Sequence, residues 1–244
     1  MQQFVPPPPV IIVGGGMAGL TTALALFRAG RPVRLYEATD SVGGRLKSRT
    51  TRQGFILDEG FQVLLDAYPA PKRWVDFSQL SPRSFDAGAL VWTGRRRVPV
   101  ANPLRHPAAI VRDITTNLFP HEDKLRLAVL AAEVVRAPWQ SANEAATSLG
   151  RDRAAVEYLW ERGFSERFIN RFARPFFGGI TFDPHLTRSI GPSLFTLKMF
   201  LQGSAVLPAA GVAALPARMA DQLPVGAVTT NARVDEIIIE DGRA

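Results

Sequence analysis

An uncharged hydrophobic run of eighteen residues, VIIVGGGMAGLTTALALF, extends from Val10 to Phe27. Its length approaches that of a membrane-spanning helix. However, four glycines lie within six positions of the run, and glycine is unfavourable inside a helix. The pattern also changes along the run. Residues 10–13 are continuously apolar, as in a buried parallel strand, and residues 17–29 have apolar positions at helical spacing. We therefore predict a strand, a glycine-rich turn and a helix, not a membrane span.

A second strand is predicted at residues 33–37, because Gly30 and Pro32 end the helix before it. Strand, glycine-rich turn, helix and strand within about thirty residues form a βαβ unit, which builds a parallel sheet. The predicted fold class is therefore α/β, with a Rossmann-like dinucleotide-binding domain.

Helical periodicity dominates the middle of the chain, and a hairpin is predicted at residues 91–100. A final apolar strand is predicted at residues 234–240, followed by the turn signal Asp241-Gly242. An unpaired apolar strand promotes aggregation, so we expect a partner or a further part of the fold to cover it. The other predicted elements are helices at 122–136, 142–149, 154–162, 166–173, 193–202 and 212–223, a loop at 176–184 and a strand at 227–230.

The composition is that of a globular protein of one or two domains: 244 residues, 46% hydrophobic and 21% charged. The net charge of +7 is compatible with an anionic partner or cofactor. The absence of cysteine excludes disulfides, thiolate nucleophiles and cysteine-based zinc sites. No Lys or Arg precedes the first apolar run, so a signal peptide is not expected. We predict a cytoplasmic protein. Contact with a membrane surface stays open, because residues 195–206 are apolar around Lys198, although a buried helix is the preferred interpretation.

The predicted turn between the first strand and the helix has the G-x-G-x-x-G spacing of a dinucleotide-binding fingerprint. Gly14 permits the tight turn, Gly16 lets a pyrophosphate approach the backbone, and Gly19 lets the helix pack closely on the strand. Met17 and Ala18 lie between them at the start of the helix, where backbone amides favour an anion.

Two further features lie at the end of the second strand and directly after it. Glu37 ends it and is placed to accept hydrogen bonds from an adenosine ribose. In the stretch EATDSVGGRLKS, Gly43 and Gly44 bring the backbone close to a ligand, and Arg45 offers a cation to a pyrophosphate. An NAD(P)-dependent dehydrogenase, which uses the same βαβ unit, stays an alternative.

This combination of motifs resembles the superfamily of flavin-dependent amine oxidases, protoporphyrinogen oxidases and phytoene desaturases. Residues 54–69, GFILDEGFQVLLDAYP, look like the family segment that carries Asp-x-Gly near the flavin, and residues 163–180 and 207–224 are similar to two later segments. The resemblance covers nearly the whole chain, most strongly its first 70 residues. It implies FAD as the cofactor. The cofactor-binding residues that it implies are Gly14, Gly16, Met17, Ala18, Gly19, Glu37, Gly43, Gly44, Arg45, Asp58, Gly60 and Val234.

The resemblance also implies a domain organisation and an activity. An FAD domain would consist of residues 1–75 and 205–244, with a largely helical substrate or cap domain at 76–204. The family ends with a Gly-Asp motif and a helix that this sequence does not contain, so we expect the C-terminal part of the fold to lie outside this chain. The implied reaction transfers two electrons from a small or apolar organic substrate to FAD, and no catalytic residue is assigned.

A second alternative and several weaker signals complete the prediction. This alternative is a non-catalytic or truncated flavoprotein fragment that needs a separate C-terminal half, or a second copy, to cover residues 234–240. The basic run at 95–97 is interpreted as a solvated turn, so no nucleic-acid partner is predicted. The acids that follow His121 are interpreted as helix-start residues rather than metal ligands, and no metal site is predicted. The phenylalanine-rich stretch at 164–177 is interpreted as core.

Overall fold

The computed structural model describes residues 7–60, 63–101, 105–106, 108, 118–150 and 152–239. The chain divides into two compact units, so that its beginning and its end share one of them. The assignment of FAD binding to one part of the chain and substrate binding to another stays a prediction. Unit 1 consists of Met1–Leu64, Pro69–Ser84 and Val206–Ala244, and unit 2 consists of Leu65–Tyr68 and Phe85–Ala205.

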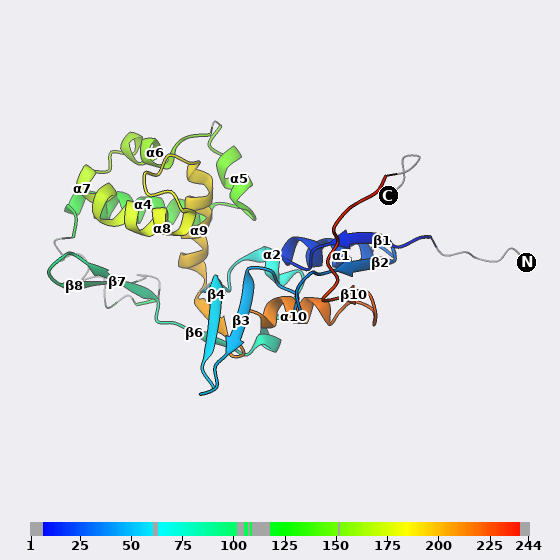
Figure 1. Ribbon diagram of the computed structural model, residues 1–244. Coiled ribbons are helices and arrows are strands. Elements are labelled where there is room, and N and C mark those ends of the chain that lie inside the picture. Colours follow the sequence, from blue (N-terminus) through cyan, green and yellow to red (C-terminus); the bar gives the residue numbers. More distant parts are fainter. Residues whose placement is uncertain are drawn as a thin grey trace, which may run out of the picture. The chain divides into compact units, whose positions relative to one another are not determined.

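Unit 1 contains the predicted βαβ unit (Figure 1). Its elements are β1 (Val10–Val13), α1 (Met17–Arg28), β2 (Val33–Tyr36) and β10 (Val228–Thr229). The three strands are parallel and lie in the order β1-β2-β10. The uncharged run at the start of the chain therefore forms a strand, a turn and a helix, as predicted. In the part of the chain that the structure describes, no helix is long and apolar enough to cross a bilayer.

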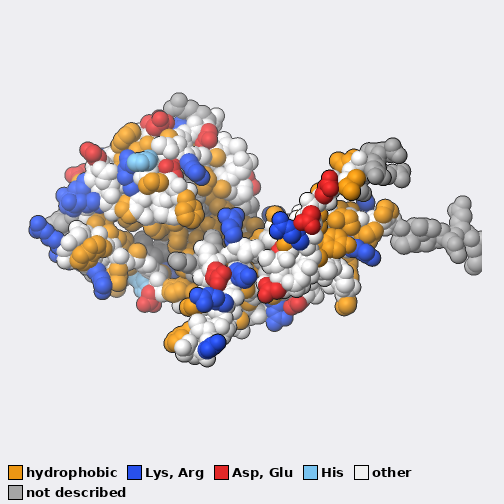
Figure 2. All heavy atoms as spheres, in the orientation of Figure 1, with side chains coloured by type: hydrophobic (Ala, Val, Ile, Leu, Met, Phe, Trp, Pro, Cys, Tyr) orange, Lys and Arg blue, Asp and Glu red, His pale blue; other side chains and the backbone are white. Residues whose placement is uncertain are grey.

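The two faces of this parallel sheet have different environments. Ile12 and Leu35 lie opposite each other in the register, and both are buried in a core with α1 and with α10 (Ala214–Ala220). Ile11 and Val13 alternate to the other face, where each is 52% exposed. Figure 2 shows hydrophobic side chains at the surface where β1 lies. β1 is an edge strand in the order β1-β2-β10, and its face with Ile11 and Val13 is exposed, whereas parallel sheets are ordinarily covered on both faces.

An antiparallel hairpin in unit 1, formed by β3 (Leu46–Thr50) and β4 (Ile56–Gly60), was not predicted. Most of its side chains are exposed, so its sequence lacks the alternation of apolar and polar residues that identifies a half-buried strand. Three short strands form a further sheet in the order β5-β9-β6. The other elements of this part of the chain are β5 (Leu64–Leu65), α2 (Pro69–Lys72), η1 (Phe77–Leu80), β6 (Pro82–Ser84) and β9 (Ala205–Pro208).

The prediction of a strand at residues 234–240 is wrong for residues 234–239, which the structure describes. Residues 232–239 have no regular secondary structure, and Ile237, Ile238 and Ile239 are exposed. A strand is stable only when a neighbouring strand satisfies its backbone groups, and no described strand pairs with these residues. Residue 240 and the Asp241-Gly242 turn signal lie outside the described residues.

Unit 2 is mainly helical, with one antiparallel hairpin. Its elements are β7 (Gly88–Trp92), β8 (Arg97–Ala101), α4 (His121–Arg136), α5 (Ala142–Thr147), α6 (Ala155–Glu161), α7 (Glu166–Phe168), η2 (Ile169–Gly178), α8 (Gly179–Thr181) and α9 (Ile190–Gln202). The helix α9 is buried along most of its length and contacts α4, α5 and α6. Phe164, Phe168 and Phe177 are buried in the same core, which confirms the interpretation of this stretch.

The helical region that begins at Glu166 extends further than predicted. After α7 the chain continues through η2, whose turns are π-helical and include Pro175, and then through α8. The first part of the predicted loop at 176–184 is therefore helical. Phe168, Ala173 and Phe177 are buried along this region, so tertiary packing outweighs the local glycine and proline signals.

Lys198 is a buried cation in α9, with 5% of its surface exposed. Its Nζ donates to the carbonyl oxygens of Ala137 at 2.6 Å and Trp139 at 2.9 Å, directly after α4. Carbonyl groups at the end of a helix carry partial negative charge that favours a cation. The lysine therefore caps α4 inside the core, which confirms the prediction of a buried helix.

We expect Lys198→Met to lower the free energy of unfolding by about 1–3 kcal/mol, because it leaves two carbonyl groups without a donor. The exposed Lys72 is the control, and Lys72→Met should change this free energy by less than about 0.5 kcal/mol. Urea unfolding of both variants measures the difference. Equal losses would contradict the capping role of Lys198.

Candidate dinucleotide-binding site

Two glycine-rich turns meet at the N-terminal end of α1. The first turn follows β1 and consists of residues 14–16, and the second contains Gly43 and Gly44. Gly43 N donates to Gly15 O at 2.8 Å, and Gly16 and Gly43 form a parallel β-bridge. The structure thus brings together two motifs that sequence reasoning had assigned to the same ligand.

The backbone geometry explains several of these glycines. Gly14 has a φ of +98° and Gly43 a φ of +118°, which L side chains rarely adopt. A Cβ atom on Gly19 would lie 2.0 Å from Gly14 O, so α1 packs directly on the first turn. By contrast, a Cβ atom on Gly14 or Gly16 would meet no atom within 4 Å. The close packing is behind the first turn, and the open space beside Gly14 and Gly16 is available to a ligand.

The start of α1 keeps its positive partial charge. Met17, Ala18 and Gly19 form its first turn, and the amides of a first turn have no partner within the helix. Gly16 at the N-cap has no side chain to accept from them, and the first turn contains no acidic residue. The helix dipole therefore favours an anion at this end.

Glu37 follows β2, and its buried carboxylate reaches the first glycine turn. Its Oε2 accepts from Gly15 N at 2.7 Å, and its Oε1 accepts from the amide and the hydroxyl of Thr39, each at 2.8 Å. These bonds, the Thr39 amide most strongly, favour the charged form and lower the pKa of Glu37 from its usual 4.5. Glu37 therefore ties the first turn to the end of β2, a role that sequence reasoning missed. Its contact with a ribose stays a prediction.

Arg45 directly follows the second glycine turn, and Val234 follows a segment that is bound to the residues after β2. Arg45 is exposed, and its side chain has no hydrogen-bond or ionic partner in the described ranges. The amides of residues 231 and 232 donate to Thr39 O and Glu37 O, each at 2.8 Å. The segment that leads to Val234 therefore runs next to the residues that follow β2. Ligand contacts of Arg45 and Val234 stay predictions.

Asp58 and Gly60, both on β4, make contacts within the protein. Asp58 Oδ1 accepts from Ser48 Oγ at 2.5 Å and from Val212 N at 3.0 Å. Gly60 has a φ of +99°, and a Cβ atom there would lie 3.0 Å from Arg45 O. Gly60 therefore lets β4 approach the residue after the second glycine turn. A contact of Asp58 with the cofactor stays a prediction.

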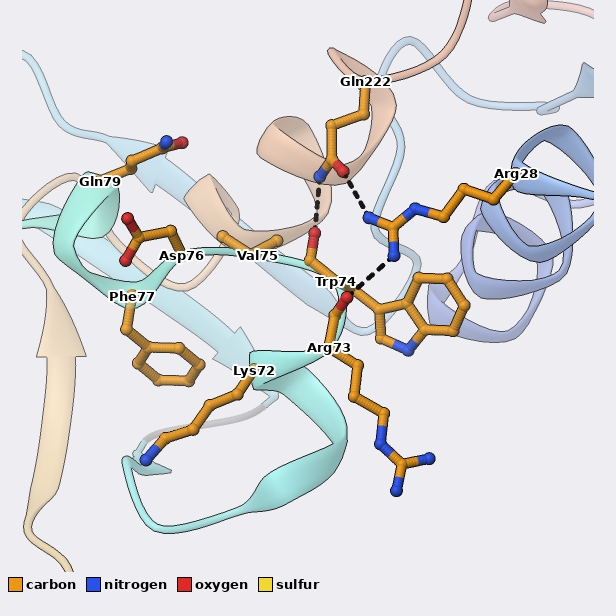
Figure 3. A pocket seen from close by; sticks show the side chains of 9 residues that line it. All are labelled: Arg28, Lys72, Arg73, Trp74, Val75, Asp76, Phe77, Gln79 and Gln222. Atoms are coloured by element: carbon orange, nitrogen blue, oxygen red, sulfur yellow. Dashed lines mark hydrogen bonds between the residues drawn. The ribbon is translucent and has the colours of Figure 1, made fainter.

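A surface pocket of about 650 Å³ lies in another part of unit 1, near the C-terminal end of α1 (Figure 3). The guanidinium of Arg28 donates to Arg73 O and Gln222 Oε1, each at 2.9 Å, and lies 4.9 Å from the ring centre of Trp74. Gln222 Nε2 donates to Trp74 O at 2.6 Å. These contacts tie α1 to two other segments of unit 1. The pocket is lined by none of the residues predicted to bind the cofactor.

Comparison with known proteins identifies the family and the relatives that this chain resembles. The sequence model of the family "Flavin containing amine oxidoreductase" matches residues 17–244. Protoporphyrinogen oxidase 2 of Arabidopsis thaliana is 24% identical over 166 residues, which are 67% of this chain and 30% of that protein. Zeta-carotene desaturase of Zea mays is 32% identical over 133 residues, which are 50% of this chain and 23% of that protein.

A solved oxidoreductase of Methanosarcina mazei has the same fold, with a TM-score of 0.63 and 17% identity. The similarity covers 96% of this chain and 54% of that one. The chain thus spans about half the length of this solved structure and less than a third of the two curated relatives. The structural similarity confirms the predicted fold class. The family match, whose description names a flavin, bears out the predicted flavin cofactor, FAD.

The two glycine turns fit such a cofactor. The diphosphate of FAD is an anion, and a close approach to the backbone requires positions without side chains. Open space beside Gly14 and Gly16, the uncapped first turn of α1 and the unpaired Arg45 supply these conditions in the described part of unit 1.

We expect Gly19→Ala to lower the free energy of unfolding by about 1–3 kcal/mol, because the added Cβ overlaps Gly14 O. Gly16→Ala is the matched control. Gly16 has a φ of −70° and open space around its Cα, so the loss should stay below about 1 kcal/mol. Chemical denaturation measures both, and similar losses would contradict the close packing of α1 on the first turn.

Glu37→Gln should lower the free energy of unfolding at neutral pH by about 1–3 kcal/mol, because an amide cannot accept from Gly15 and Thr39 with both ends. The pKa of Glu37 is lowered on folding, so its contribution is complete above the usual pKa of 4.5 and is lost as the pH falls through the folded value. The difference in the free energy of unfolding between wild type and E37Q should therefore become smaller as the pH falls.

Denaturation curves between neutral and acid pH measure this difference. The exposed Glu236 provides the control, since E236Q should track the wild type at every pH. A difference between wild type and E37Q that does not change with pH would contradict the role assigned to the charge of Glu37.

Proposed function

Because the chain belongs to the family of flavin containing amine oxidoreductases, we propose that its two glycine turns hold the diphosphate of FAD in an oxidoreductase. The substrate in this proposal is a small or apolar organic molecule that gives two electrons to the flavin. The observation that carries the proposal is the contact of Gly43 with Gly15 and Gly16 beside open space at the start of α1.

Each group around the turns has a role in this proposal. The first-turn amides of α1, from Met17 to Gly19, donate to the diphosphate, and Arg45 adds a positive charge. Glu37 holds the first turn in place and, through its remaining lone pairs, can accept from the ribose. Val234 lies at the adenine side. FAD supplies the electron-accepting chemistry, and the protein binds and orients it.

The names of the matched relatives support an organic substrate of low polarity. One is a protoporphyrinogen oxidase and one a zeta-carotene desaturase. No acid, base or nucleophile is assigned to the reaction, because electron transfer to a flavin requires orientation and exclusion of water more than a protein nucleophile.

A second candidate is a flavoprotein part that binds FAD only together with a further polypeptide. Ile11 and Val13 on β1 are exposed, as are the isoleucines at 237–239. The chain also spans only about half of its solved relative. These observations support a second half of the fold, or a second copy of this chain, as the partner that covers these side chains.

We expect Gly16→Val to lower the FAD content of the purified chain at least about tenfold, because its side chain fills the space beside the turn. Arg45→Ala should lower it by a smaller factor, because one charged contact with the diphosphate is lost. Flavin absorbance per protein and titration with FAD measure both effects. Unfolding free energies should stay within about 1 kcal/mol of the wild type.

Gly179→Val and Arg52→Ala are the matched controls. Gly179 also has open space around its Cα but lies in unit 2, and Arg52 is an exposed arginine at the tip of the β3–β4 hairpin. Unchanged FAD content in both test variants would refute the assigned site. A stable wild-type chain that takes up no FAD would favour the second candidate.

A further inference from the structure

The β3–β4 hairpin supplies hydrogen-bond acceptors to the residues that begin α10. Ser48 and Asp58 are cross-strand partners in the hairpin, and Ser48 Oγ donates to Asp58 Oδ1 at 2.5 Å. Val212 N donates to the same Oδ1 at 3.0 Å, and Ala213 N donates to Ser48 Oγ at 3.0 Å. The hydroxyl of Ser48 thus accepts from one amide and gives its single proton to Asp58.

The start of α10 has no side-chain cap from its own N-cap residue. Its N-cap residue, Ala213, has no side chain that accepts a hydrogen bond, and its first turn contains no acidic residue. Amides at the start of a helix need acceptors, which Ser or Asp at the N-cap ordinarily provides. Here a serine and an aspartate of the hairpin accept from the two amides that lead into the helix, those of Val212 and the N-cap residue Ala213, and Asp58 is separated from Val212 by 154 residues of sequence. The first-turn amides of Ala214 and Leu215 donate to Gly211 O and Val212 O.

Gly211 lets the hairpin reach these amides. It has a φ of +86°, and a Cβ atom there would lie 2.5 Å from Ser48 Oγ and 2.8 Å from Ile56 Cγ2. A larger residue would force the hairpin away from the start of α10. We call Ser48, Asp58 and Gly211, with the two amides they serve, the hairpin clamp.

The helix α10 in turn supports the second glycine turn. A Cβ atom on Gly43 would lie 2.8 Å from Pro216 Cγ, so the backbone of this turn lies directly on α10. Gly43 also donates to Gly15 O, in the first turn. A continuous series of contacts therefore leads from Asp58 through α10 to both glycine turns.

We propose that Asp58 and Ser48 are positioning residues for the FAD site, which act by holding α10 beneath Gly43. In this assignment Asp58 acts through α10 and Gly43, whereas the family resemblance predicts direct contact of Asp58 with the cofactor. The effect on FAD rests on the proposed function, but the clamp itself does not.

The test compares Asp58→Ala and Ser48→Ala with Glu59→Gln. Glu59 is the next residue on the same strand, and its exposed carboxylate pairs with Arg49 at 3.1 Å. Two quantities are measured on the full chain: hydrogen exchange of the Val212 and Ala213 amides, and the Kd for FAD of the folded protein. Asp58→Asn, which keeps an oxygen at the accepting position, is the rescue variant.

We expect exchange of the two amides to become at least about tenfold faster in Asp58→Ala, and the Kd for FAD to rise by about tenfold. Glu59→Gln should match the wild type, and Asp58→Asn should lie between. In a double variant that combines Ser48→Ala with Asp58→Ala, the increases in exchange rate and in the Kd for FAD should be less than additive, because both residues act on the start of one helix. If Asp58→Ala fails to fold, Ser48→Ala and Asp58→Asn provide the same comparison.

Three outcomes separate the parts of the proposal. Unchanged exchange at Val212 and Ala213 would overturn the clamp. Faster exchange with an unchanged Kd for FAD would show a merely structural role and overturn the positioning role. A wild-type chain that binds no FAD would refute the proposed function, while the exchange data would still decide whether the clamp exists.

Discussion

The hydrogen bond from Gly43 N to Gly15 O joins two turns that have no side chains with which to hold each other. This contact brings the two parts of the candidate cofactor site in unit 1 together. The first turn offers the amides at the start of α1, and the second offers Arg45 and close backbone. Glycines have no side chains that could pack across this contact and restrict the backbone. The relative position of the two turns must therefore be set by the elements that pack behind each turn.

Those elements come from distant parts of the chain. Behind the first turn are Gly19, whose missing Cβ lets α1 lie against Gly14 O, and Glu37, whose carboxylate binds Gly15 N. Behind the second turn is α10, held at its own start by Asp58 and Ser48. Residues near 15, 43, 58 and 212 must therefore be placed together before a ligand can bind. This explains physically why the beginning and the end of the chain share unit 1.

Sequence reasoning predicted the parts of this arrangement that are local. The spacing of Gly14, Gly16 and Gly19 within one strand-turn-helix unit is a local pattern, and the structure has that unit as predicted. The hairpin clamp could not be predicted, because it joins residues far apart in sequence and its strands carry no clear apolar alternation. The strand expected at 234–240 failed for a related reason. Its apolar residues favour a strand, but a strand also needs a neighbour, and the described part of the fold supplies none.

The uncovered face of β1 bears on the site because the first glycine turn begins where β1 ends. Ile11 and Val13 leave apolar surface in water, and covering such surface favours the folded form of the strand. A ligand that binds only the folded turns stabilises the same strand from its other end. In the proposed function, binding of FAD and covering of β1 would therefore be coupled, because both favour the folded form of the same strand. In that proposal the affinity for FAD would depend on what covers β1 as well as on the residues that contact the cofactor.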